Sequence, residues 1–288
     1  MINWFIKNWE TYKVTNQIPY IFAVWLPFHA GAILGVYWAI ESWSWWYILY
    51  AVIGWTVFGG VGTAIMLHRY SAHSAIIVRN SLKPMLLWIA CMAGQGSPIW
   101  WAALHRGYHH AHSDKEKDLH SPTKGFWNAY MGWMFKIHHN SVNLKYAGSL
   151  LRDKTMLWFH KHYNVVIWSS ICVLWIINPM LCLWFYIIPM LIDLHTDSLV
   201  NSLCHSPSHG YRGFDTNDLS CNVWYLGLFG WGQGWHNNHH AKQRSFDFGT
   251  SVSGKWYEFD PCLLLVPFIA PMSETIRLWK QRRNSCAG

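Results

Sequence analysis

Charged residues are scarce in this chain of 288 residues, where Asp, Glu, Lys and Arg together make up 12% and hydrophobic residues 52%. A soluble globular domain has about 25% charged residues, so the shortage argues against an ordinary soluble protein and favours a membrane protein. Acidic residues are fewer than basic ones, with 14 Asp and Glu against 22 Lys and Arg, which gives a formal net charge of +8. A protein partner attracted by charge would therefore be acidic.

Cysteine motifs are also lacking. The seven cysteines are scattered and form no C-x-x-C pair, which argues against a zinc ribbon or a Cys-ligated iron–sulfur centre. Scattered free thiols are typical of a reducing, cytoplasmic-side environment. The first residues do not have the layout of a signal peptide. Because no internal repeat or linker is visible, we expect a single domain over 1–288.

Long uncharged runs, by contrast, are present. Residues 18–40 and 43–67 carry no formal charge, and at about 1.5 Å per residue each can cross the roughly 30 Å hydrocarbon core. Only Glu41 and Ser42 separate them, so we expect a transmembrane hairpin. A third run is divided by Asn178 and Pro179, which favours two further spans, at about 160–177 and 180–200, over one long tilted span.

One more apolar run, 84–104, has the hydropathy of a span. Its middle reads Gly-Gln-Gly-Ser-Pro, which would break a helix in mid-membrane, so we expect a helix at the interface instead. The Lys and Arg residues lie near the N-terminus, between the second and third runs, and after residue 200, so these parts should face the cytoplasm. The predicted fold is all-α: a four-helix transmembrane bundle with a cytoplasmic helical cap formed by 68–159 and 201–288.

Tryptophan and histidine are over-used, at 22 and 18 residues. Tryptophan is typical of membrane–water boundaries, and histidine is the commonest metal ligand. Nine histidines stand out, eight in three short segments and one at the end of the last predicted span. They are His68 and His73; His105, His109 and His110; His236, His239 and His240; and His205, which follows Asn201 by four residues.

Helical geometry indicates how these histidines point, because each residue of an α-helix turns the side-chain direction by about 100°. His105 and His109 should share a face, as should His236 and His240. His68 and His73 would lie about 140° apart, which suits ligands of two different metals. We therefore predict two metal ions with about four imidazoles each. Segments that share one metal pair must lie on one side of the membrane, which again excludes 84–104 as a crossing.

The number of histidines bears on the metal. Imidazole suits zinc, copper, iron and nickel, but zinc sites take only three or four protein ligands. A two-metal site made of nitrogen ligands favours iron and the activation of dioxygen. A zinc-dependent membrane hydrolase would need about three His and a carboxylate base, and a metal transporter would place His or Asp within several spans. Neither alternative explains grouped histidines at membrane ends.

The other histidines are expected to have other roles. His112 and His120 lie near the second segment and are either outer partners or weak ligands. We expect the rest to be hydrogen-bonding residues near the interface: His29, His138, His139, His160, His162, His195 and His209.

The three histidine segments resemble the histidine boxes of the membrane fatty-acid desaturases, of the delta-9 acyl-CoA or acyl-lipid type in a bacterial-like form. The segments read HRYSAH over 68–73, HRGYHH over 105–110 and GWHNNHHA over 234–241. Similar stretches are found at 113–122, 201–205, 210–218 and 256–260. The second segment departs from the acyl-CoA branch, since three residues rather than two separate His105 from His109.

This resemblance implies a mushroom-shaped helical fold with two irons in the cap, ligated by the nine histidines, and a bent tunnel for an acyl chain. It implies O2-dependent formation of a cis double bond in a chain linked to CoA, a carrier protein or a lipid. Hydroxylation or acetylenic-bond formation on a carrier-bound chain is the alternative. Trp101 and Thr196 are similar in position to tunnel residues, and we expect Asn201 to hold a water beside one iron. Without a heme-binding or Cys-rich segment, the electrons should come from a separate ferredoxin or cytochrome b5; we expect no nucleic-acid partner.

Overall fold

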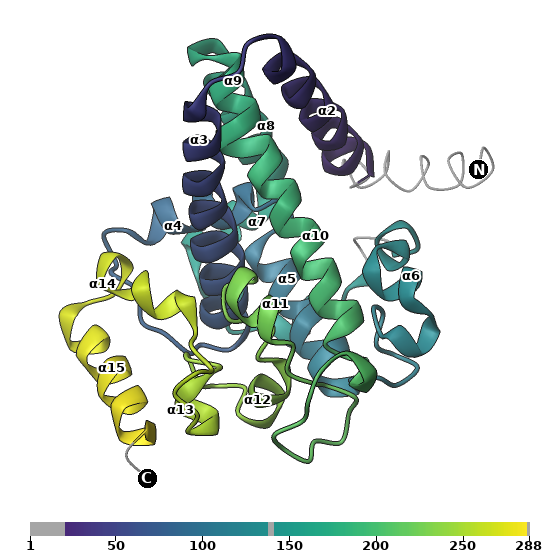
Figure 1. Ribbon diagram of the computed structural model, residues 1–288, viewed down its shortest axis with the longest axis vertical. Coiled ribbons are helices and arrows are strands. Elements are labelled where there is room, and N and C mark those ends of the chain that lie inside the picture. Colours follow the sequence, from purple (N-terminus) through teal and green to yellow (C-terminus); the bar gives the residue numbers. More distant parts are fainter. Residues whose placement is uncertain (1–20, 138–140, 287–288) are drawn as a thin grey trace.

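The computed structural model describes residues 21–137 and 141–286, and no strand occurs within them. The molecule has a tall helical part and a broader end built of short helices and loops (Figure 1). Three helices of the described chain are long and apolar enough to cross a membrane: Phe22–Glu41, Trp45–Ala72 and Pro179–Leu203. The predicted all-α class is confirmed.

The first two long helices are joined by a short turn, as the sequence predicts. They match the spans expected at 18–40 and 43–67, although the first three residues of the earlier span lie outside the described chain. Ser44 begins the second helix, because its hydroxyl oxygen accepts a hydrogen bond from the backbone N–H of Trp46. The helices are π-helix η1 (Ile21–Trp25), α2 (Leu26–Glu41), α3 (Trp45–Trp55) and π-helix η2 (Thr56–Ala72).

The later apolar region breaks where the sequence predicts. Asn178 is extended (φ −165°, ψ 119°), and its side-chain oxygen accepts hydrogen bonds from the backbone N–H groups of Met180 and Leu181. Pro179 occupies the first helical position, where no N–H is needed. The helices are α7 (Lys154–Lys161), α8 (Tyr163–Ile177), α9 (Pro179–Leu181), π-helix η9 (Cys182–Ile187) and α10 (Ile188–Leu203).

The apolar run 84–104 forms two short helices, α4 (Lys83–Met92) and α5 (Pro98–Leu104), so the predicted break is confirmed. In the turn between them Gly94 has φ +74°, in the left-handed region that favours glycine. A Cβ on Gly94 would also lie only 2.7 Å from the sulfur of Met190. The glycine therefore lets the turn lie close against α10.

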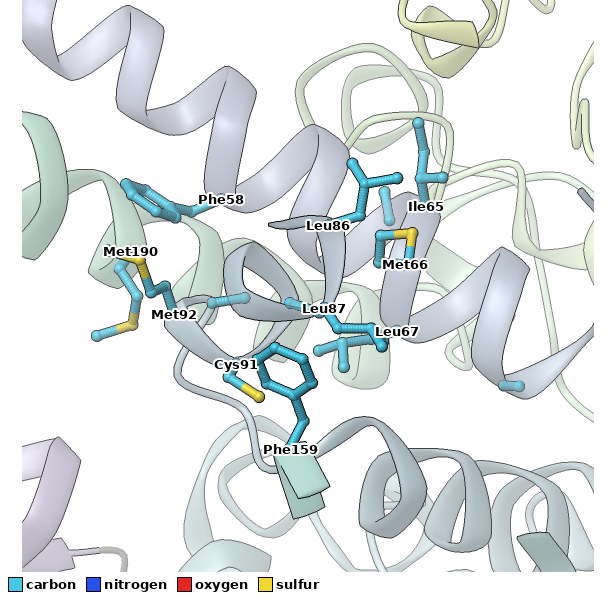
Figure 2. Close-up of a cluster of buried hydrophobic side chains, with 14 of the residues drawn as sticks. Phe58, Ile65, Met66, Leu67, Leu86, Leu87, Cys91, Met92, Phe159 and Met190 are labelled. Carbon is cyan, nitrogen blue, oxygen red and sulfur yellow. The ribbon is translucent and has the colours of Figure 1, made fainter. Parts of the chain in front are cut away.

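An apolar core joins η2 to the helices around it. Figure 2 shows Phe58 and Met66 of η2 with Leu87 of α4, Phe159 of α7 and Met190 of α10. None of these five residues is more than 4% exposed. Burying a side chain of this size contributes about 1.5–3 kcal/mol, so the core fixes the end of η2 firmly.

A buried ion pair attaches the C-terminal part of the cap to η2. The guanidinium of Arg69 donates to Asp260 at 2.7 Å and to the backbone oxygens of Phe246 and Trp231, and neither side chain of the pair is exposed. Removing one partner of such a pair typically costs about 3–5 kcal/mol of folding free energy.

The cap is built of short helices. It contains π-helix η3 (His105–His110), η4 (Pro122–Lys124), α6 (Phe126–Tyr130), η5 (Gly132–Phe135), η7 (Leu144–Ala147), η8 (Leu150–Arg152), η10 (Pro207–His209), α11 (Trp224–Phe229), α12 (His236–Ala241), α13 (Thr250–Ser253), η11 (Pro261–Leu264), α14 (Val266–Ile269) and α15 (Met272–Cys286).

Candidate metal centre

Histidines from four parts of the chain meet where the tall helices join the cap. All nine predicted ligands are brought together in two groups, and within each group one nitrogen of every side chain lies within 4.8 Å of the others. Except for His110, none of the nine is more than 8% exposed. Group one comprises His68, His73, His105, His110 and His239. Group two comprises His109, His205, His236 and His240.

A π-helix places the first two members of group one. In such a helix each backbone N–H bonds to the carbonyl five residues earlier, and the N–H of His73 bonds to the carbonyl of His68 at 3.1 Å. Residues five apart therefore lie close to one face. The prediction that His68 and His73 serve different metals assumed an α-helix and is wrong, because both belong to group one.

The second histidine segment, η3, is also a π-helix. His105 and His110 both face group one, with their Nε2 atoms 2.9 Å apart, whereas His109 turns to group two. The expectation that His105 and His109 share a face is therefore wrong for the same reason. The wider turn accommodates the additional residue of this segment, and the Nε2 atom of His105 also lies 2.9 Å from that of His73.

The third segment, α12, is α-helical and points as predicted. His236 and His240 face group two, and His239 turns to group one, where its Nε2 lies 3.0 Å from that of His68. His205 follows α10 and joins group two, with its Nε2 atom 2.9 Å from that of His236. One short helix thus contributes candidate ligands to both groups.

Three members of group two have their outer nitrogen, Nδ1, on a carboxylate. Burial opposes ionisation of these aspartates, but the facing imidazoles and further hydrogen bonds hold the pKa of each below its usual value. An ionised carboxylate fixes the proton on Nδ1 and leaves the Nε2 lone pair free for a metal. The pairs are His240 with Asp218 at 2.7 Å, His205 with Asp114 at 2.8 Å, and His109 with Asp118 at 3.3 Å.

The inward nitrogens of both groups fit a cation. When Nδ1 of a neutral ring donates outward, Nε2 carries a lone pair, and lone pairs that face each other at about 3 Å repel unless a cation lies between them. An all-imidazole set suits iron, zinc or copper. Burial lowers the pKa of most of these rings, so they are neutral at pH 7. The pKa is about 3 for His73 and about 4 for His240, and it lies well below the usual value for His105, His110, His236 and His239.

Group one has no carboxylate partner among the described residues. Nδ1 of His68 lies 2.8 Å from Oε1 of Gln233, whose amide in turn donates to Asp197. The Nδ1 atoms of His110 and His239 are buried, and neither has a hydrogen-bond partner among the described residues. Within the described residues, no carboxylate therefore contacts the rings of group one directly.

Trp101, predicted to line a substrate tunnel, lies against group one. Its ring stacks on that of His105, with centroids 4.6 Å apart, and contacts that of His68 at 5.4 Å. Its indole N–H donates to Gln95, whose amide donates to Asp197 at 2.7 Å. An aromatic wall beside candidate ligands is well placed to touch a substrate, although the tunnel itself stays a prediction.

Thr196 and Asn201, both on α10, are not drawn into the histidine groups. The hydroxyl of Thr196 donates to the Ile192 carbonyl of its own helix at 2.7 Å. Asn201 is half-buried one turn before His205, and its side chain makes no hydrogen bond to the nine histidines of the described chain. The tunnel role of Thr196 and the water-holding role of Asn201 stay predictions.

His120 supports group two from outside. It is buried, its ring lies 4.5 Å from that of His109, and its Nδ1 is 3.7 Å from Asp118, so these three form a further set of possible ligands. His112 belongs to no set. The remaining histidines of the described chain make hydrogen bonds, as predicted, and His138 and His139 lie outside it. The partners are His195 for His29, Ser97 for His160, the Trp158 carbonyl for His162 and Ser206 for His209.

A family model described as fatty acid desaturase matches residues 42–244, a range that contains every member of groups one and two. The chain belongs to the fatty acid desaturase family. It is thus an oxidoreductase of lipid metabolism that acts on fatty-acyl chains.

Curated relatives of this desaturase cover most of its length. Delta-9 acyl-lipid desaturase 2 of Arabidopsis thaliana is 32% identical over 261 residues, which cover 88% of this chain and 80% of the relative. The sn-1 stearoyl-lipid 9-desaturase of Anabaena variabilis is 30% identical, covering 85% of this chain and 89% of the relative. Acyl-CoA 5-desaturase AL21 of Anemone leveillei is 31% identical, covering 76% and 67%. These names include both lipid-linked and CoA-linked substrates.

Proposed function

We propose that this protein is a multi-pass integral membrane enzyme that uses O2 and two iron ions to introduce a cis double bond into a fatty-acyl chain. The observation that carries the proposal is the pair of inward-facing imidazole groups in a member of a desaturase family. Group one would hold one ion and group two the other. Bound iron would supply the activation of O2, which no side chain can perform.

The side chains around the groups orient the ligands and exclude water. Asp114, Asp118 and Asp218 hold the Nδ1 protons of group two, and Gln233 does the same for His68. Trp101 would hold the acyl chain against group one with the carbons to be oxidised nearest the metals. Asn201 would hold a water beside one ion, and Thr196 would line the tunnel further along α10.

The reaction requires an electron supply. Removal of two hydrogens from adjacent carbons provides two electrons, whereas reduction of one O2 to two waters needs four. Two further electrons and two protons must therefore be delivered in each turnover. A separate carrier, such as a ferredoxin or cytochrome b5, would deliver the electrons, since no C-x-x-C pair or heme-binding segment occurs in the sequence.

The proposed topology has four spans in one domain over 1–288. The three long apolar helices and α8, which has 15 residues and follows α7 almost without a break, would form the bundle. The cap, 68–159 and 201–288, would face the cytoplasm because most Lys and Arg residues lie in it. An even number of crossings then keeps all three histidine segments on one side.

The proposed substrate is an acyl chain carried by a membrane lipid or by CoA, as the names of the relatives suggest. The test is expression in a desaturase-deficient host, followed by mass spectrometry of the fatty acids with the double bond located. We expect new cis-monounsaturated chains that disappear when His239 is changed to Ala. A hydroxylated or acetylenic product from iron-loaded protein would contradict desaturation and favour the alternative oxidation.

A further inference from the structure

An open surface pocket reaches one of the candidate ligands from the side of the cap. His240 and Ser251, 8% and 9% exposed, form its deeper part, and the exposed side chains of Lys242, Arg244 and Gln281 surround it. The pocket lies where α12, α13 and α15 meet, at the end of the molecule opposite the α2–α3 turn (Figure 1). Under the proposed topology this end faces the cytoplasm.

The rim of this pocket is positively charged. Neither Lys242 nor Arg244 pairs with a carboxylate within the described residues. Lys242 and Arg244 therefore present unbalanced positive charge to the solvent.

The neighbouring carboxylates do not neutralise this rim. Asp218 accepts a hydrogen bond from Nδ1 of His240, and Asp247 accepts one from the hydroxyl of Ser251 at 2.7 Å. Asp247 also lies 3.8 Å from Arg282 of α15. Both acids are thus engaged beneath the surface, and the field above the pocket favours a negatively charged partner.

The same pocket gives short access to both groups. Nε2 of His240 lies 3.2 Å from that of His109 in group two, and the ring of His240 contacts that of His110 in group one, with centroids 4.5 Å apart. Of the nine candidate ligands, His240 alone lines the pocket. Trp101, the proposed tunnel wall, instead meets the cluster at His105 and His68. The pocket and the tunnel wall therefore approach the cluster at different histidines.

We propose that this pocket is the docking site of an acidic one-electron carrier protein, which presents its redox group to the edge of His240. The inference rests on the proposed function and says where its electrons enter. Each encounter transfers one electron and releases the oxidised carrier, so two encounters serve one turnover. A small charged rim without a large apolar patch suits such a short-lived complex, because electron-transfer encounters bury little area and form quickly by electrostatic steering.

The test is a charge-reversal pair, Lys242→Glu with Arg244→Glu, in the full-length iron-loaded enzyme. A reduced plant-type ferredoxin is the donor, and its KM is measured at low and high ionic strength. We expect the KM for ferredoxin to rise about tenfold at low salt, with the difference shrinking as salt screens the charges. The matched control, Lys115→Glu with Lys117→Glu, makes the same change of charge at two exposed lysines that do not line the pocket, and it should leave the KM unchanged.

Two further measurements separate the possible outcomes. Reduction of the iron by dithionite and the KM for the acyl substrate should not change in the pocket variant, which shows that the site is intact. An unchanged KM for ferredoxin would overturn the docking site. A raised KM for the acyl substrate instead would also overturn it and assign the rim to an anionic headgroup. Failure of the wild-type enzyme to bind iron or desaturate would count against the proposed function and not against the pocket alone.

Discussion

The two histidine groups differ in what surrounds them. In group two, three imidazoles donate to the carboxylates of Asp114, Asp118 and Asp218. In group one, His68 has the neutral amide of Gln233, and two rings have no outer partner among the described residues. Two groups with the same ligand type therefore offer a metal different electrostatic surroundings.

This difference suggests that the two groups differ in metal affinity and in their distance from the substrate. Outer carboxylates raise the basicity of imidazole ligands and fix their orientation, so group two should hold its ion more tightly. Group one has fewer outer partners but lies against Trp101, the proposed tunnel wall. The looser group would thus be the one nearer the substrate, and the following predictions test that asymmetry.

The largest effect should follow loss of a ligand. His205→Ala in group two and His73→Ala in group one should each abolish desaturation, because each imidazole occupies a distinct position. Iron analysis of the purified variants should show that each change removes iron. His209→Ala is the control: this exposed residue bonds only to nearby serines, and its variant should keep iron and activity. Full iron and normal desaturation in His205→Ala would show that His205 is only structural.

A smaller loss should follow removal of an outer partner. Asp218→Asn should lower the metal affinity of group two about 10- to 100-fold, since outer hydrogen bonds to ligating histidines have effects of this size. Gln233→Leu should lower the affinity of group one less, because His68 then loses a neutral partner and not a carboxylate. Metal titrations monitored by absorbance would compare them. Asp215→Asn, an exposed acid nearby, is the control for Asp218, and equal losses in Asp218→Asn and Asp215→Asn would contradict the role of the Asp218–His240 contact.

Removal of metal from the intact protein should reveal the same asymmetry as a smaller effect. We expect a chelator to withdraw iron in two phases, with the faster phase from group one. Asp218→Asn should accelerate the slower phase and leave the faster one unchanged. A single phase for both ions in the wild-type protein would argue that the surroundings do not distinguish the groups.

The smallest effect concerns pH in the metal-free protein. Burial lowers the pKa of His73 to about 3 and of His240 to about 4 in the folded protein, whereas histidines of the unfolded chain have a pKa of about 6.5. As the pH falls below about 6.5, the unfolded chain therefore binds more protons than the folded protein. Stability should therefore fall as pH drops from 7 to 5, and the Tm in detergent should fall by several degrees. A Tm of the metal-free protein that stays constant over this range would contradict neutral buried imidazoles.

Local signals explain which features the sequence predicts well. The nine histidines cluster in short segments, and the breaks at Gly94 and Asn178 follow from residues whose backbone preferences act within one turn. The directions of the histidine side chains were predicted less well, because π-helices carry no signal in hydrophobic periodicity. An α-helix would turn His68 and His73 toward different metals, whereas the wider turn of the π-helix brings both into group one.

Contacts between distant parts of the chain explain what the sequence does not predict. Asp114 and His205 are 91 residues apart, so no spacing links them. The aspartates lie in polar stretches that resemble the desaturase family, but nothing local distinguishes an outer partner from a solvated acid. The sequence does not predict the Arg69–Asp260 pair either, since this pair forms only when the C-terminal part of the cap packs against η2.

The most direct test of two iron ions on nine histidines is metal analysis of the purified protein, combined with X-ray absorption at the iron edge. We expect about two irons per chain, with a first coordination shell made mainly of nitrogen at imidazole distances. Iron should fall toward zero when His239 and His240 are both changed to Ala, since one belongs to each group. A single zinc per chain, or iron bound mainly by oxygen or sulfur, would contradict the account.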